Sequence, residues 1–195
     1  MKTNILILGT LSCALLIACN SKEKEKKSEE FYEPVTAIVE DPVERGKYLV
    51  NTHDCIDCHS PKKFTDKGME VDTDRLLSGH PADEKLPPYD NKTAQSYVLF
   101  TMGFTSAKGP WGTSFAANLT PDATGIGTWT EDQFLNCIKK GLYKGLEGSR
   151  PLLPPMPWEN YAKLTDDDLK AIFAYLKTLK PVENIVPAPI APKMN

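Results

Sequence analysis

Residues 55–59 read Cys-Ile-Asp-Cys-His, and this stretch decides how the rest of the chain is organised. Two cysteines three positions apart, followed at once by a histidine, form the attachment signature of a covalently bound haem. Each thiol can add to one vinyl group of the porphyrin, and an imidazole nitrogen of His59 can bind the iron. The spacing requires a short helical turn, so that all three side chains face one macrocycle. We therefore predict one covalent haem c, attached at Cys55 and Cys58, with His59 as an axial ligand.

Three other kinds of site also use a Cys-x-x-Cys pair. Zinc usually needs four ligands and often a second cysteine pair, but Cys19 and Cys137 form no such pair, and the other histidines are His53 and His80. A thioredoxin-like pair requires a strand–helix setting, whereas the residues before 55 have a helical pattern. A disulfide in so tight a loop is strained and constrains little chain. These three remain as alternatives to covalent haem.

A second axial ligand is expected from a methionine in a loop close to the last helix. Met156 lies in Leu-Pro-Pro-Met-Pro-Trp, residues 153–158, and the flanking prolines fix the backbone around it. Met102 falls in a predicted helix and is expected in the core, whereas Met69 is expected on the surface. His80 is the rival ligand, and it would give a lower reduction potential than methionine.

The first 40 residues predict export and anchoring. Residues 1–18 have a positive start and a short apolar core, and they end in Leu-Ile-Ala before Cys19, the pattern of a lipoprotein signal peptide. We expect Cys19 to carry the lipid and residues 19–40, rich in Lys and Glu, to form a flexible tether. An uncleaved anchor is the alternative. Because bacteria attach haem to such motifs outside the cytoplasmic membrane, the expected location is the cell envelope, facing the periplasm or exposed at the cell surface.

The remaining pattern predicts an all-α domain at residues 41–180, with long loops wrapping the haem and a proline-rich tail at 181–195. Helix caps and apolar periodicity place the main helices. The expected helices cover 42–51, 93–102, 131–140 and 166–179. Strands should be few, and Cys137 should be a buried helical thiol. A net charge of −3 and a pI near 5.7 argue against nucleic acid as a partner.

The order of these features resembles a class I c-type cytochrome, and more closely the cytochrome modules of periplasmic alcohol and sugar dehydrogenase systems. The shared stretches are 45–49, 58–61, 79–81, 118–122, 124–129, 155–157 and 169–176. The resemblance implies thioether bonds at Cys55 and Cys58, a proximal ligand at His59 and a distal ligand at Met156. Many relatives carry two or three such modules, whereas this chain has a single motif.

The resemblance also implies two features of the packing. The first and last helices should cross with Gly46 near Phe173 or Tyr175. Three further side chains should line the haem edge or bind its propionates, although an aromatic core residue is the default interpretation for such tryptophans. They are Trp111, Asn118 and Trp129.

These observations predict an electron carrier rather than an enzyme. The expected function is a membrane-anchored single-haem cytochrome that carries single electrons between a redox donor and a redox acceptor protein. Iron with two axial ligands has no open position, so no small-molecule substrate is expected. Acidic patches should steer a basic partner toward the haem edge. The alternatives are a fixed electron-transfer subunit of a membrane-associated dehydrogenase or oxidase, and a haem enzyme acting on peroxide.

Overall fold

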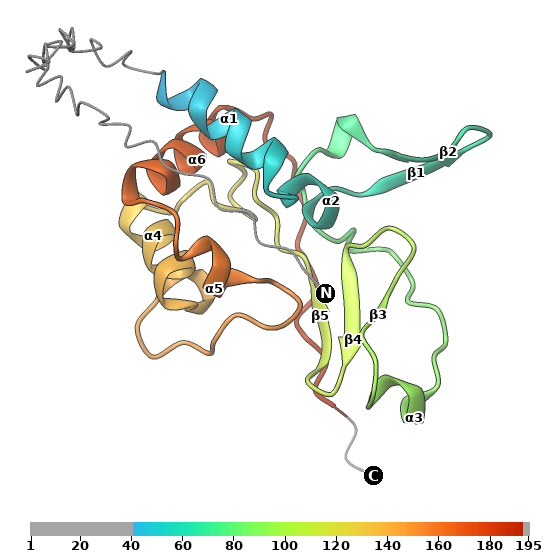
Figure 1. Cartoon of the computed structure of the whole chain (residues 1–195). Helices are drawn as coiled ribbons and strands as arrows, with labels where there is room; N and C mark the ends of the chain where they lie inside the picture. Colours follow the sequence, from blue (N-terminus) through green and yellow to red (C-terminus); the bar gives the residue numbers. More distant parts are fainter. Residues whose placement is uncertain (1–40, 193–195) are drawn as a thin grey trace, which may run out of the picture. The chain divides into compact units, whose positions relative to one another are not determined.

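The computed structural model describes residues 41–192, which belong to one compact unit. The expected signal peptide, lipid-bearing Cys19 and tether lie outside these residues. Within the described part, helices pack around one core and two small antiparallel sheets are added to them (Figure 1). The helical class is as predicted, and the sheets are additional to it. None of the helices described is both long and apolar enough to cross a membrane.

Helices α1 (Pro42–Thr52) and α6 (Asp166–Thr178) cross at the centre of the core. Asp41 caps α1 by accepting a hydrogen bond from the backbone N–H of Val43 at 2.9 Å. The helices approach closely because Gly46 has no side chain. A Cβ atom at Gly46 would overlap the carbonyl oxygen of Ala171 and lie 2.9 Å from the Cβ of Tyr175. The predicted crossing near Tyr175 is therefore confirmed.

Helix α4 (Glu131–Lys140) has the bounds that the sequence predicts. Thr130 and Gln133 form a reciprocal capping box at its start, and Gly141, with a φ of 63°, ends it. The helix packs on α6 through Phe134, whose ring centroid lies 5.3 Å from that of Phe173. Cys137 is a buried free thiol on this helix, as predicted.

The region between the Cys-x-x-Cys-His stretch and α4 contains more strand than expected. A hairpin consists of β1 (Lys62–Thr65) and β2 (Gly68–Val71), and a second sheet has the order β3 (Leu99–Phe100), β4 (Ser106–Gly109), β5 (Gly112–Phe115). The helix predicted at 93–102 is wrong. Only α3 (Asn91–Ala94) is helical, because residues 99–100 pair with β4 instead. Aromatic and β-branched side chains in this stretch fit a strand better than a helix.

The segment after α6 is extended, as predicted, but it packs onto the rest of the unit. Ile190 and Thr113 exchange two backbone hydrogen bonds, of 2.8 and 3.0 Å, so the tail covers the outer edge of β5. A short helix that the sequence did not indicate, α5 (Trp158–Tyr161), follows the loop that carries Met156. The expected division into a domain and a separate tail thus gives way, in the described part, to one packed unit.

Candidate cofactor site

Helix α2 (Cys55–His59) holds both cysteines and the histidine of the motif in five residues. Asp54 has a left-handed backbone, with a φ of 57°, and this turns the chain from α1 into α2. Cys55 and Cys58 are half-buried, and neither forms a disulfide. Burial raises the pKa of Cys55 to about 11 and also raises the pKa of Cys58. Both thiols are therefore protonated and unpaired at neutral pH.

The imidazole of His59 is held by one of its two nitrogens. Its Nδ1 lies 2.8 Å from the carbonyl oxygen of Ala117, which can only accept a hydrogen bond. Nδ1 therefore carries the proton, and Nε2 keeps a free lone pair. Burial lowers the pKa of His59, although the hydrogen bond to Ala117 opposes this shift. A neutral imidazole fixed through Nδ1 is the usual state of a histidine that binds a metal.

Two loop segments far apart in sequence fix the Ala117 carbonyl against His59. Gly79 donates from its backbone N–H to the carbonyl oxygen of His59 at 2.7 Å, and His80 donates to the carbonyl of Ala116 at 2.9 Å. Gly79 has a φ of 80°, and any Cβ atom there would overlap residues 116 and 117. The Ser-Gly-His-Pro stretch, residues 78–81, thus packs its backbone closely against residues 116 and 117, and this contact supports His59.

Met156 lies in the proline-rich loop before α5, half-buried. The Ser114 hydroxyl of β5 donates to the carbonyl oxygen of Pro154 at 2.5 Å, which ties this loop to the second sheet. Met156 and Cys55 both pack against the one hydrophobic core of the described chain. The fold therefore brings the loop and α2 to the same core, while the role of Met156 as a ligand stays a prediction.

The other ligand candidates lie in different surroundings. Met69 is exposed, as predicted, but Met102 is 73% exposed, so its expected place in the core is wrong. His80 is fully buried. Its Nδ1 lies 2.9 Å from the Thr105 hydroxyl, and its Nε2 has no hydrogen-bond partner among residues 41–192. Burial lowers the pKa of His80 to about 4.

Asn118 has a structural role that the sequence did not suggest. Its side-chain amide donates to the carbonyl of Val182 at 2.8 Å, and its oxygen accepts from the backbone N–H of Thr120 at 2.9 Å. These partners already use both ends of the amide, so the expected bond to a haem propionate is not supported. The Trp111 indole donates to Ser114 at 3.2 Å, and Trp129 packs against the core.

The donor set fits a covalently attached haem better than a bare ion. Two free thiols and an imidazole with an open Nε2 lie on one short helix. Among the described residues, no group of three His, Cys, Asp or Glu side chains could hold a metal ion. The zinc alternative therefore has no ligand set in this part of the chain. Cys55, Cys58 and His59 are the residues that would hold the haem, and its iron would supply one-electron chemistry.

Comparison with known proteins decides the family. Residues 43–180 match the family model for cytochrome c. The chain belongs to the cytochrome c family. Members of this family carry haem c, so the predicted cofactor and the predicted class are confirmed, whereas the number of haems is not tested.

Several relatives of this cytochrome are subunits of dehydrogenases. It is 32% identical over 171 residues to the gluconate 2-dehydrogenase cytochrome c subunit of Pantoea cypripedii, covering 87% of this chain and 26% of that one. It is 30% identical to the cytochrome c subunit of the quinone alcohol dehydrogenase of Gluconobacter oxydans (strain 621H), covering 72% and 22%. It is 29% identical to the fructose dehydrogenase cytochrome subunit of Gluconobacter japonicus, covering 77% and 24%. This cytochrome spans about a quarter of the length of these relatives.

Lys62 supports helix α2 of this cytochrome, and sequence reasoning missed this role. Its ammonium donates to the carbonyl oxygens of Asp57 and Ser60, each at 2.7 Å, at the carboxyl-terminal end of α2. A cation there satisfies carbonyls that have no partner inside the helix. The sequence signal that could have indicated this role is a lysine that closely follows the Cys-x-x-Cys-His stretch.

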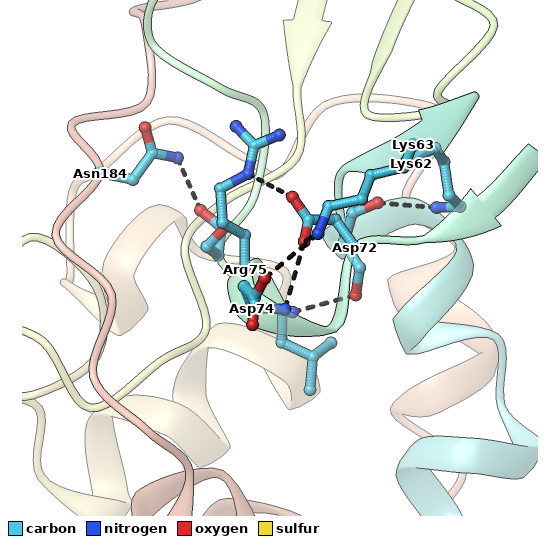
Figure 2. Close-up of polar contacts among 9 residues, drawn as sticks. Lys62, Lys63, Asp72, Asp74, Arg75 and Asn184 are labelled. Atoms are coloured by element: carbon cyan, nitrogen blue, oxygen red, sulfur yellow. Dashed lines mark hydrogen bonds and ion pairs between the residues drawn. The ribbon is translucent and has the colours of Figure 1, made fainter. Parts of the chain in front are cut away.

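A second group of residues that sequence reasoning missed surrounds the buried carboxylate of Asp72, at the end of β2 (Figure 2). Lys63 lies 2.8 Å from one of its oxygens and Arg75 lies 2.7 Å from the other. Burial works to raise the pKa of Asp72, but the hydrogen bonds from Lys63 and Arg75 outweigh it, and the pKa lies below its usual value. This ion cluster anchors the turn that leads to Ser78 and Gly79. No short-range sequence pattern marks it.

Proposed function

We propose that this cytochrome transfers single electrons as the cytochrome c subunit of a membrane-associated dehydrogenase. The single observation that carries the proposal is the geometry of His59, whose Nδ1 is bonded to Ala117 and whose Nε2 is free, on the same short helix as the two free thiols of α2. The names of the relatives support a fixed subunit over the free shuttle that the sequence first suggested. The donor would be the dehydrogenase and the acceptor a further redox protein.

The proposed cofactor is one haem c, bound covalently by Cys55 and Cys58. The single Cys-x-x-Cys-His stretch in the sequence supports one haem. His59 and Met156 are the proposed axial ligands. Ligation on both faces leaves no open position for a substrate, and this supports electron transfer over peroxide chemistry. In this arrangement the protein fixes both ligands, so that little rearrangement accompanies a change of oxidation state.

We further propose that the cytochrome is a lipoprotein anchored at Cys19 and facing the periplasm. The support is the pattern of residues 1–19, which precedes a stretch rich in Lys and Glu. A lipid anchor would keep the folded unit near a membrane-associated dehydrogenase. Labelling with a radioactive fatty acid tests this proposal: label should enter the full chain and be lost in Cys19→Ser.

An optical redox titration of the full chain, matured with haem, tests the function. We expect a c-type spectrum, covalent haem that survives denaturing electrophoresis, and a reversible one-electron transition. Cys55→Ser and Cys58→Ser should each reduce covalent attachment. A colourless product would refute the proposal, and so would oxidised haem that binds peroxide rapidly. Co-purification with a dehydrogenase after membrane solubilisation distinguishes a fixed subunit from a free carrier.

A further inference from the structure

Helix α5 connects the loop of Met156 to the rest of the unit. It begins at Trp158, two residues after Met156, and ends at Tyr161. A hydrogen bond of 2.8 Å from the N–H of Ala162 to the carbonyl of Trp158 closes its single turn. The indole of Trp158 lies against Gly141 at the end of α4, where a Cβ atom would lie 2.5 Å from the ring. The segment that follows Met156 is therefore held in one position relative to α4.

Tyr161 also joins α5 to the start of α2. Its hydroxyl donates to the backbone carbonyl oxygen of His53 at 2.7 Å, a bond that spans 108 residues. His53 is the C-cap of α1 and lies two residues before Cys55, the first residue of α2. Carbonyls at the end of a helix have no partner within it, so a donor from elsewhere has to satisfy them. The bond from Tyr161 thus fixes the turn between α1 and α2 to the segment that carries Met156.

The phenol of Tyr161 lies in partly buried, apolar surroundings. Cys55, Met156 and Tyr161 all pack against the same hydrophobic core. Burial is the main reason why the pKa of Tyr161 rises to about 12. The phenol therefore keeps its proton at neutral pH and remains a hydrogen-bond donor. A hydrogen bond in such surroundings is electrostatically stronger than one in water.

The thiol of Cys55 is the second donor that reaches the carbonyl of His53. Its Sγ lies 3.8 Å from that oxygen. Covalent attachment would add the sulfur and the hydrogen of this thiol across a vinyl double bond, so that one C–S bond and one C–H bond form and the π bond is lost. The thioether sulfur then has no proton to donate. Within residues 41–192, the hydroxyl of Tyr161 would be the one donor left on this carbonyl.

We propose that Tyr161 is a positioning residue that holds the proposed iron ligand Met156 in register with helix α2. The inference rests on the proposed function, because it requires that Cys55 holds the haem and that Met156 binds its iron. Tyr161 acts through the carbonyl of His53 on one side and through the single turn of α5 on the other. Loss of its hydroxyl should therefore weaken the hold on Met156 and loosen α2 at the same time.

Two other substitutions serve as matched controls. Tyr175 of α6 packs against the same core, and its hydroxyl has no hydrogen-bond partner in the described part of the chain. Tyr175→Phe therefore makes the same chemical change as Tyr161→Phe without breaking a hydrogen bond. Ser114→Ala removes a different anchor of the Met156 loop, the bond to the carbonyl of Pro154, which ties the loop to β5 and not to α2.

Competition by free imidazole at pH 8 tests the proposal on the oxidised, haem-bearing full chain. Imidazole binds only where Met156 has left the iron, so its apparent affinity reports how firmly the chain holds Met156. The readout is loss of the methionine–iron absorption band. Tyr161→Phe should raise the affinity for imidazole about fivefold, as expected for the loss of one part-buried hydrogen bond. Tyr175→Phe should leave this affinity unchanged.

Amide hydrogen exchange on the same haem-bearing proteins measures the coupling between the two segments. Tyr161→Phe should accelerate exchange both in residues 57–60 and in residues 161–164, whose N–H groups close the turns of α2 and of the segment around α5. Ser114→Ala should raise the affinity for imidazole, because it frees the other end of the Met156 loop, but it should leave exchange in residues 57–60 unchanged.

The other outcomes overturn the inference. An unchanged imidazole affinity in Tyr161→Phe, or an equal rise in Tyr175→Phe, would mean that the hydroxyl does not position Met156. A lower free energy of unfolding in Tyr161→Phe with unchanged imidazole affinity would assign the hydroxyl a structural role alone. Faster exchange of residues 57–60 in Ser114→Ala would show that α2 responds to any loosening of the loop.

The parent chain distinguishes failure of the inference from failure of the proposed function. A methionine–iron band in the oxidised parent, together with any of these contrary results, would leave the proposed ligation by Met156 intact and refute the role of Tyr161. Absence of that band from the parent would refute both the ligation and the inference.

Discussion

Met156 is the residue on which the proposed ligation most depends. Met156→Ala should leave the haem attached, because Cys55 and Cys58 are untouched, but it should remove the second axial ligand. We expect loss of the methionine–iron absorption band of the oxidised protein and a fall in reduction potential on the order of 100 mV or more. The control is Met102→Ala, which removes a thioether that lies in solvent. An unchanged band in Met156→Ala would move the ligand to another methionine of the chain.

His80 predicts how stability depends on pH. Its pKa of about 4 in the folded chain lies below the ordinary value of 6.5, so it is neutral when folded and gains a proton on unfolding between these values. The stabilising contribution is complete above pH 6.5 and is lost as the pH falls toward 4. The loss should amount to about 3 kcal/mol.

His80→Gln tests this dependence, since an amide can still bond to Thr105 but does not titrate. Urea unfolding at pH 7, 5.5 and 4 should show a smaller fall in the free energy of unfolding in the variant than in the parent chain. If the free energy of unfolding falls in parallel with pH in the two proteins, His80 contributes nothing to the loss of stability at low pH.

At the scale of an element, the β1–β2 hairpin is held at its base by the Asp72 cluster. Asp72→Asn leaves Lys63 and Arg75 without their buried charged partner. Because both cations retain some solvent exposure, water partly compensates for the loss. We expect a loss of about 2 kcal/mol in the free energy of unfolding at pH 7. The control is Asp74→Asn, which removes an 80% exposed partner of Lys63 and should cost less than about 0.5 kcal/mol.

The pH dependence provides a second readout for the same variant. Because the pKa of Asp72 is lowered by folding, its contribution is present above the ordinary pKa of 3.8 and is lost as the pH falls through the folded value. The difference between Asp72→Asn and the parent chain should therefore shrink below pH 4. A difference that stays constant down to pH 2 would show that the carboxylate charge is not the cause.

At the scale of the whole molecule, Asn184 ties the tail to the loops that support His59. Its amide donates to the carbonyls of Ser78 at 2.7 Å and His80 at 2.9 Å, and its oxygen accepts from the N–H of Ala82 at 3.1 Å. Asn184→Ala should cost about 2 kcal/mol in the free energy of unfolding, because buried carbonyls lose their donors. Amide hydrogen exchange in residues 78–82 should accelerate.

The neighbouring substitution Glu183→Ala is the control for this tail contact. Glu183 is exposed, so its removal should change neither the free energy of unfolding nor exchange in residues 78–82. Equal effects of the two substitutions would mean that the tail contributes through general packing and not through the amide of Asn184.

Local patterns predicted the helices well because their signals lie within a few residues of one another. The caps at Asp41, Thr130 and Thr165 and the stop at Gly141 all act inside one or two helical turns. The helix predicted at 93–102 was wrong for the opposite reason. Its residues pair with β4, and such pairing depends on residues 107 and 108, which no helical period reveals.

The sequence by itself determined the family and the positions of the main helices, and it predicted the attachment chemistry. A Cys-x-x-Cys-His stretch, its order relative to Met156 and the caps are all patterns along the chain, so no tertiary contact is needed to identify them.

Only the tertiary structure decided which side chains lie beside the site and what holds them. The bond from His59 to Ala117 spans 58 residues, and the bond from Asn184 to Ser78 spans 106. The position of the Lys62 ammonium likewise depends on how the hairpin and the second sheet meet α2. Such contacts join residues that are distant in sequence, because burial and hydrogen bonding act between neighbours in space.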